Sequence, residues 1–158
     1  MSENAPRELT LETRASIADI PKSDWQRLAG VSNPFLRYEF FQALEESGCT
    51  CPETGWTPSH LVFKHEGRLT GLAPAYLKTH SMGEYVFDWS WAEAYQRYRL
   101  PYYPKLLLAI PFTPSAGPRL LLDAGARRQL TPERLHDLLD TLTHHLGAHS
   151  WHLLFPNA

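Results

Sequence analysis

The sequence predicts a mixed α/β domain built around one sheet, and three observations carry that prediction. Strand-like and helix-like segments follow one another along the chain, and Pro and Gly separate them. Hydrophobic residues make up 43% of the 158 residues, and a chain of this length buries roughly 70% of its unfolded surface. We therefore expect a flexible tail at residues 1–9 and a single α/β domain over residues 10–158.

The N-terminal part of that domain is expected to form a strand, two helices and a hairpin. Their predicted bounds are 10–15 for the strand, 21–28 and 37–47 for the helices, and 60–65 and 69–78 for the strands of the hairpin. Pro74 has no N–H to donate, so the second hairpin strand should lie at a sheet edge or carry a bulge. Residues 85–88 are a candidate extension of it.

The C-terminal part should add two helices and further strands. Ser90 and Glu93 read as a capping box that begins a helix over 91–98, and extended segments are expected at 105–111, 119–122 and 151–155. The last helix is the clearest, because Thr131 caps it and Gly147 ends it. Its apolar stripe is Leu135, Leu138, Leu139, Leu142 and Leu146.

Charge and composition exclude several classes of function. The net charge of -2 leaves little to neutralise a run of phosphates, so we expect no binding to DNA. The longest apolar run, 106–112, is about a third of what a membrane span needs. The N-terminus lacks the build of a signal peptide, which predicts a cytoplasmic protein.

Metal and cysteine chemistry are not indicated either. Cys49 and Cys51 are too close in the chain for an unstrained disulfide, and no second cysteine pair completes a zinc site, so we expect free thiols and no metal. Five of the eight histidines lie in the last 23 residues, where surface positions near a helix C-terminus explain them. The motifs of serine hydrolases, nucleotide-binding loops and zinc proteases are missing from the sequence.

Aromatic residues gather in one window. Eight of the nineteen lie within nineteen consecutive positions: Tyr85, Phe87, Trp89, Trp91, Tyr95, Tyr98, Tyr102 and Tyr103. Such rings could wall a pocket for a sugar or peptide, with Glu84, Asp88 and Glu93 fixing its orientation. The alternative is that the rings pack the inserted helix onto the sheet.

A second candidate is the proline-broken segment 110–119. Small residues and prolines leave backbone groups unpaired there, and Gly117 allows a ligand to approach the main chain, so the break could hold an acyl or phosphate group. A bulge at a sheet edge would explain the same residues. If the first reading holds, this break and the aromatic window should line one shared cleft.

Several segments resemble FemAB-like, GNAT-related proteins of peptidoglycan biosynthesis or recognition, over about residue 14 to the end. They are Asn33–Leu36, Glu45–Gly48, Glu53–Trp56, His80–Trp89, Trp91–Tyr95, Tyr102–Lys105, Pro111–Pro114 and Gly117–Arg119. This resemblance implies a GNAT-like acyl-CoA N-acyltransferase fold that stops after the fifth strand. It also implies that the C-terminal half of the same protein is a missing partner.

The resemblance implies N-acyl or aminoacyl transfer to an amine, on a cell-wall peptide precursor, with acyl-CoA or aminoacyl-tRNA as donor. Residues 125–128 depart from the glycine-rich signature by which GNAT relatives hold pyrophosphate. Two alternatives stay open: a non-catalytic module that binds glycan or peptide, and a fragment that self-associates through an open sheet edge.

The transfer reaction needs a base for the amine proton and donors for the developing oxyanion. Glu84 and Asp88 are the candidate catalytic bases, and the amides around 115–117 are the candidate oxyanion donors. The candidate substrate-binding residues are Trp89, Tyr95, Tyr102, Tyr103, Lys105, Thr113, Ser115, Gly117 and Arg119.

Overall fold

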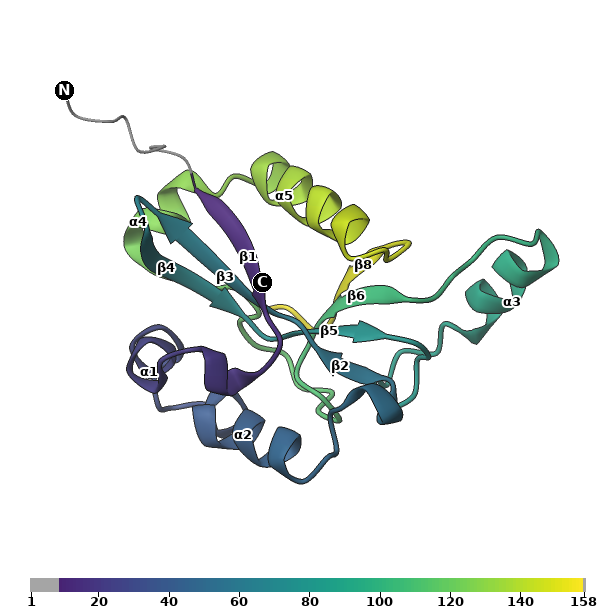
Figure 1. The fold of residues 1–158 in the computed structure, drawn as a ribbon, viewed down its shortest axis with the longest axis horizontal. Coiled ribbons are helices and arrows are strands. Elements are labelled where there is room, and N and C mark those ends of the chain that lie inside the picture. The colour runs from purple at the N-terminus through teal and green to yellow at the C-terminus, as the bar shows by residue number, and fades with distance from the viewer. Residues whose placement is uncertain (1–8, 158) are drawn as a thin grey trace.

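The computed structural model describes residues 9–157, so the tail predicted at 1–9 lies almost wholly outside the described residues. Figure 1 shows how the elements are arranged. The strands are β1 (Thr10–Arg14), β2 (Trp56–Pro58), β3 (His60–His65), β4 (Arg68–Ala73), β5 (Ala75–Lys78), β6 (Lys105–Leu108), β7 (Leu121–Leu122) and β8 (Trp151–Leu153). The α-helices are α1 (Lys22–Ala29), α2 (Tyr38–Glu46), α3 (Trp89–Arg97), α4 (Ala124–Gln129) and α5 (Pro132–His145).

The mixed α/β class is confirmed, but the strands form two sheets where the sequence predicted one. One sheet has the order β1-β3-β4-β7 and the other β2-β5-β6-β8, in which β6 and β8 run parallel. Pro74 separates β4 from β5, since it cannot donate to a strand ladder. The N–H of Ala75 donates instead to Nδ1 of His60, at 3.3 Å. Neither half of the interrupted strand lies at a sheet edge.

Helices cover the strands from two sides. In Figure 1, α5 lies on one side of the strands and α1 and α2 lie on the other. The leucine stripe of α5 packs against a core that includes Leu61 and Phe63, as its spacing predicted. Val62 and Leu72 instead join the core beside Trp25 of α1. Successive residues of β3 therefore serve opposite cores, as expected of a strand buried on both faces.

Most predicted elements form, with shorter strands than expected. The hairpin turns at Glu66 and Gly67, both with positive φ, as a two-residue turn requires. The segment expected over 105–111 ends at Leu108, that over 119–122 keeps two residues, and that over 151–155 keeps three. Helix α4 was not anticipated. Its cap is Asp123, whose side chain accepts from the N–H of Ala126.

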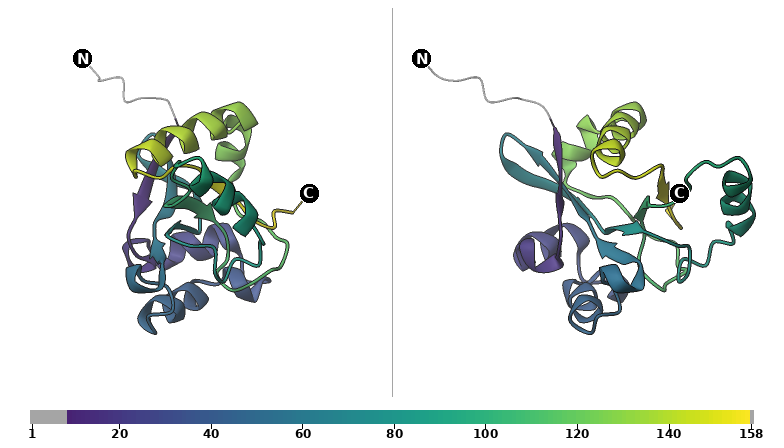
Figure 2. Two further views of the ribbon diagram at one scale, coloured as in Figure 1. Left: turned by 90° about the vertical axis from the view of Figure 1, so that its right-hand side faces the viewer. Right: turned by 45° about the vertical axis from the view of Figure 1, so that its right-hand side comes forward.

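The inserted helix α3 differs most from its prediction. It begins at Trp89, and the carbonyl of Asp88 accepts from the N–H groups of Trp91 and Ala92, so the capping box at Ser90 was wrong. Residues 85–88 form no strand. The helix buries no side chain of its own, and it stands apart from the rest of the chain in Figure 1 and in the right-hand view of Figure 2. Its aromatic residues therefore do not pack it onto a sheet.

Across residues 9–157, no helix has the length and apolar character needed to cross a bilayer.

Candidate functional site

Two lysines are buried side by side beneath the aromatic segment. Lys78 ends β5 and Lys105 begins β6, and the two residues pair directly across the antiparallel strands. Their relative exposures are 0% and 1%. Lysine is almost never fully buried unless its charge is paired, so these two side chains require nearby acceptors.

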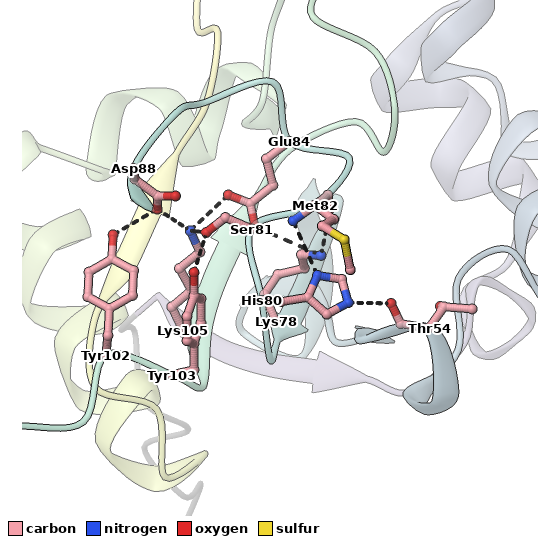
Figure 3. Close-up of polar contacts among 10 residues, drawn as sticks. All are labelled: Thr54, Lys78, His80, Ser81, Met82, Glu84, Asp88, Tyr102, Tyr103 and Lys105. Atoms are coloured by element: carbon pink, nitrogen blue, oxygen red, sulfur yellow. Dashed lines mark hydrogen bonds and ion pairs between the residues drawn. The ribbon is translucent and has the colours of Figure 1, made fainter. Parts of the chain in front are cut away.

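Acidic side chains from the following loop supply those acceptors (Figure 3). The Nζ of Lys105 donates to Ser81 Oγ, Glu84 Oε2 and Asp88 Oδ2, each at 2.8 Å. The Nζ of Lys78 donates to the carbonyl of Met82 at 3.2 Å and lies 3.9 Å from Glu84 Oε1. We call Lys78, Ser81, Glu84, Asp88 and Lys105 the lysine cluster; its two positive and two negative charges balance.

Two tyrosines tie the returning chain to this cluster. The hydroxyl of Tyr102 donates to Asp88 Oδ2 at 2.8 Å, and the hydroxyl of Tyr103 lies 2.7 Å from Ser81 Oγ. Residues 85–103, which we call the aromatic arm, are thus held at both of their ends by the lysine cluster.

Burial shifts the pKa values within the cluster. It raises the pKa of Glu84, although Lys105 opposes the shift. Burial would also raise the pKa of Asp88, but hydrogen bonds from Lys105 and Tyr102 bring it below its ordinary value. The pKa of Lys78 falls to about 8 because burial penalises its charged form. Of the two carboxylates, Glu84 is therefore the stronger base.

The aromatic arm lines a wide-open pocket of about 730 Å³, which we call the aromatic cavity. Helix α3 forms one wall and the returning segment 99–103 forms the other. Its lining residues are Trp89, Ala92, Glu93, Gln96, Arg99, Leu100, Pro101, Tyr102 and Tyr103. Its volume lies in the range of small-molecule sites.

A second cavity, of about 350 Å³, lies beside β7 and the end of the chain, and we call it the arginine cavity. Its lining includes Arg119 and Arg127 and no carboxylate side chain. Arg119 is buried, and its guanidinium donates to the carbonyls of Leu154 and Ser115, at 2.9 and 2.5 Å. Burial lowers the pKa of this guanidinium.

The structure brings only part of the predicted site together. Glu84, Asp88, Lys105, Tyr102 and Tyr103 meet in and around the lysine cluster, as just described. Trp89 lines the aromatic cavity, and Tyr95 packs edge-on against Tyr102 without lining it. Arg119 lines the arginine cavity, which shares no residue with the aromatic one.

Thr113, Ser115 and Gly117 line neither of these two cavities. The amide of Ser115 donates to the carbonyl of Thr113, and the amide of Gly117 donates to that of Phe155. Two of the amides around 115–117 that were expected to meet an oxyanion, those of Ser115 and Gly117, are therefore already bonded within the chain. The proline-broken segment reaches the loop that precedes the aromatic window, since the N–H of Phe112 donates to the carbonyl of Gly83 at 3.2 Å.

Sequence reasoning missed Lys78 and Ser81. Lys78 was assigned only as the end of a strand, and its role depends on being opposite Lys105 in the β5–β6 pairing. The inserted arm separates these two strands in the chain. Knowing that they pair would have identified Lys78 as a neighbour of Lys105. Within the described range, 9–157, no three His, Cys, Asp or Glu side chains gather as a metal site would require.

Comparison with known proteins agrees with the resemblance seen in the sequence. Searches of curated proteins and of solved structures found no match to this chain. The model of the FemAB-like family, described as peptidoglycan biosynthesis/recognition, matches residues 16–158. The match covers most of the chain, including both cavities and the whole lysine cluster, and this protein therefore belongs to the FemAB-like family.

Proposed function

We propose that the chain has a GNAT-like fold and is one domain of an N-acyltransferase that joins an activated acyl or aminoacyl group to an amine of a cell-wall peptide precursor. Membership of a family described as peptidoglycan biosynthesis/recognition supports the choice of a cell-wall precursor as acceptor. The element order supports the fold, because two helices follow β1 and the parallel pair β6–β8 is connected through α5.

The arginine cavity is the observation that carries this proposal. Both donor classes, acyl-CoA and aminoacyl-tRNA, bear phosphates, which arginine binds with a planar fork of N–H groups. In the described part of the chain, the buried guanidinium of Arg119 donates only to backbone carbonyls, and none of the lining residues described there has a carboxylate side chain to neutralise Arg119 or Arg127. An anionic donor would supply the missing negative charge.

In the proposed reaction, the amine nitrogen attacks the donor carbonyl and a C–N bond forms. The bond from that carbonyl to the sulfur of CoA, or to the ribose oxygen of tRNA, breaks. Glu84 is the better candidate for taking the amine proton, because its pKa is raised whereas that of Asp88 is lowered. One oxygen of each carboxylate, Oε1 of Glu84 and Oδ1 of Asp88, lacks a hydrogen-bond partner among the described residues. Asp88 holds Lys105 and Tyr102 in place.

Calorimetric titration with acetyl-CoA, and separately with aminoacyl-tRNA, tests this function. We expect one of the two donors to bind and Arg127→Met to weaken that binding. Arg128→Met is the matched control, since it removes the same charge from the neighbouring position of α4 and Arg128 does not line the cavity. If neither donor binds, or if both variants act alike, the acyltransferase proposal fails.

A non-catalytic binding module is the second candidate. The observation favouring it is that Glu84 and Asp88 are both bonded to Lys105 within a charge-balanced cluster, so neither carboxylate stands free beside the aromatic cavity. Binding of muropeptides without binding of either acyl donor would select this function over the first.

A further inference from the structure

We infer that the aromatic cavity is a binding site for an uncharged saccharide of the N-acetylated amino-sugar class. The inference deepens the proposed function and rests on it, because it names the part of a cell-wall precursor that the aromatic arm would bind. Four features of the cavity support it: its flat surfaces, their fixed orientation, its balance of charge and the backbone at Arg99.

Flat apolar surfaces form much of the lining. Trp89, Tyr102 and Tyr103 contribute rings, and Leu100 and Pro101 contribute aliphatic surface. A pyranose ring carries its C–H groups on its two faces and its hydroxyls around its rim, so it stacks on flat rings while its rim reaches polar groups. A site of about 730 Å³ is within the volume that ligands of this size occupy.

The two tyrosine rings are held in place before any ligand arrives. The hydroxyl of Tyr102 is bonded to Asp88 and that of Tyr103 to Ser81, and the two rings pack perpendicular to each other with centroids 4.9 Å apart. Tyr95 braces Tyr102 from the side, at 5.2 Å. A surface ordered in advance loses little conformational entropy on binding.

The polar lining indicates an uncharged ligand. Glu93, Gln96 and Arg99 provide one acid, one amide and one base, so the formal charges of the lining cancel. These groups can bond to hydroxyls and to an acetamide. An anionic ligand would be better matched by the arginine cavity, whose described lining has two arginines and no acidic side chain.

Arg99 has a conformation that glycine adopts more easily. Its φ is 55°, and it ends α3 in a Schellman-type turn, where Arg99 N–H donates to Gln96 and Leu100 N–H donates to Tyr95. Glycine would occupy this position without strain. A long polar side chain at a strained position that also lines a cavity points to a role in binding.

Fluorine NMR can test the inference on the whole chain labelled with 5-fluorotryptophan. The five tryptophans give five resonances. Titration with N,N′,N″-triacetylchitotriose is expected to shift the Trp89 resonance and leave that of Trp91 unchanged. A synthetic anionic stem peptide without sugar is expected not to shift Trp89. A peptide that shifts Trp89 where the saccharide does not would overturn the inference.

Two tryptophans of α3 make a matched pair of variants. Trp89 and Trp91 are 59% and 66% exposed, and only Trp89 lines the cavity. Trp89→Ala should weaken saccharide binding between about two- and tenfold, the value of one aromatic contact. Trp89→Phe should retain part of the affinity, and Trp91→Ala all of it. Equal losses in Trp89→Ala and Trp91→Ala would exclude the cavity as the site.

The inference and the proposed function fail in different ways. If an acyl donor binds and the saccharide does not, the saccharide site is wrong and the acyltransferase proposal stands. If the saccharide binds through Trp89 and no acyl donor binds, the acyltransferase proposal is wrong, and the site belongs to a binding module.

Discussion

Lys105 is the residue on which the lysine cluster depends, because its ammonium bonds to both buried carboxylates. Lys105→Met keeps an unbranched side chain of similar length and leaves Glu84 and Asp88 without that cation. We expect the free energy of unfolding to fall by about 3–5 kcal/mol, as when one partner of a buried ion pair is removed. Urea denaturation of the protein and the variant measures the change.

Lys64→Met is the control for that experiment. Lys64 also pairs with a carboxylate, Glu12, at 2.9 Å, but both side chains are partly exposed. Its loss should cost no more than about 1 kcal/mol. Similar costs for the two variants would show that the buried cluster adds nothing beyond a surface ion pair.

Lys78 gives the folded protein a specific dependence on pH. Its pKa is about 8 when folded, against an ordinary value of 10.5. Between these values the unfolded chain binds more protons than the folded chain, so the stability contributed by Lys78 rises with pH, by at most about 1.4 kcal/mol per pH unit. Below pH 8 the cost of burying the charge is fully present.

The difference in unfolding free energy between the protein and Lys78→Met isolates this dependence. Both unfolding free energies are measured by denaturation from neutral pH to about 10.5. As pH rises above about 8, the unfolding free energy of the protein should increase steadily relative to that of Lys78→Met. A constant difference across that range would show that Lys78 keeps its ordinary pKa in the folded state.

At the scale of elements, the sequence predicts those whose signals are local. Helix α5 was predicted because Thr131, Pro132 and the leucine stripe all lie within it or directly beside its ends, and the structure shows the Thr131 hydroxyl accepting from the N–H of Arg134. The start of α3 was not predictable from Ser90 and Glu93. It depends on Asp88, whose side chain is held by Lys105, seventeen positions further along the chain.

The same distinction applies to the candidate site. Residue type and proximity in the sequence were enough to select Glu84, Asp88 and Tyr102. Lys78 could not be selected, because only the pairing of β5 with β6 places it opposite Lys105. The division into two sheets was missed for a related reason. At the point where the sheets divide, the N–H of Ala75 donates to the His60 side chain, and His60 belongs to β3, a different strand.

Gly83 lies where the loop that follows β5 meets the segment that follows β6. A Cβ at this position would lie 2.7 Å from the Phe112 ring and 3.1 Å from the Trp56 ring, and φ is +79°. Gly83→Ala should therefore add a steric clash of about 1–3 kcal/mol to the cost of a positive φ. Thermal or urea unfolding measures the total loss.

Gly48→Ala separates the two contributions. Gly48 has a similar φ of +72°, and a methyl group at its Cβ position would meet open space, with no atom within 4 Å. The loss in Gly83→Ala should exceed that in Gly48→Ala by the cost of the clash. Equal losses of unfolding free energy in the two variants would mean that Phe112 moves aside freely. The contact between the Gly83 loop and the Phe112 segment would then be weak.

At the scale of the whole molecule, stability should be unevenly distributed. Helix α5 buries Leu139 and Thr143, whereas α3 buries no side chain. The Tyr95 ring of α3 packs on Tyr102, and hydrogen bonds to the lysine cluster tie the two ends of the aromatic arm. Elements with few buried contacts open at low free energy without unfolding the rest. The aromatic arm is therefore the part of the described chain whose opening should depend most directly on the lysine cluster.

Hydrogen exchange followed by mass spectrometry tests this distribution. Amides of α3 should exchange well before those of α5, and Lys105→Met should accelerate α3 more than α5 because it releases the ends of the arm. Repeating the measurement at two protein concentrations, with light scattering, separates protection by the fold from protection by self-association. If α3 exchanged as slowly as α5 at both concentrations, the arm would be stabilised by contacts within the chain beyond those described, and the cluster would not control it.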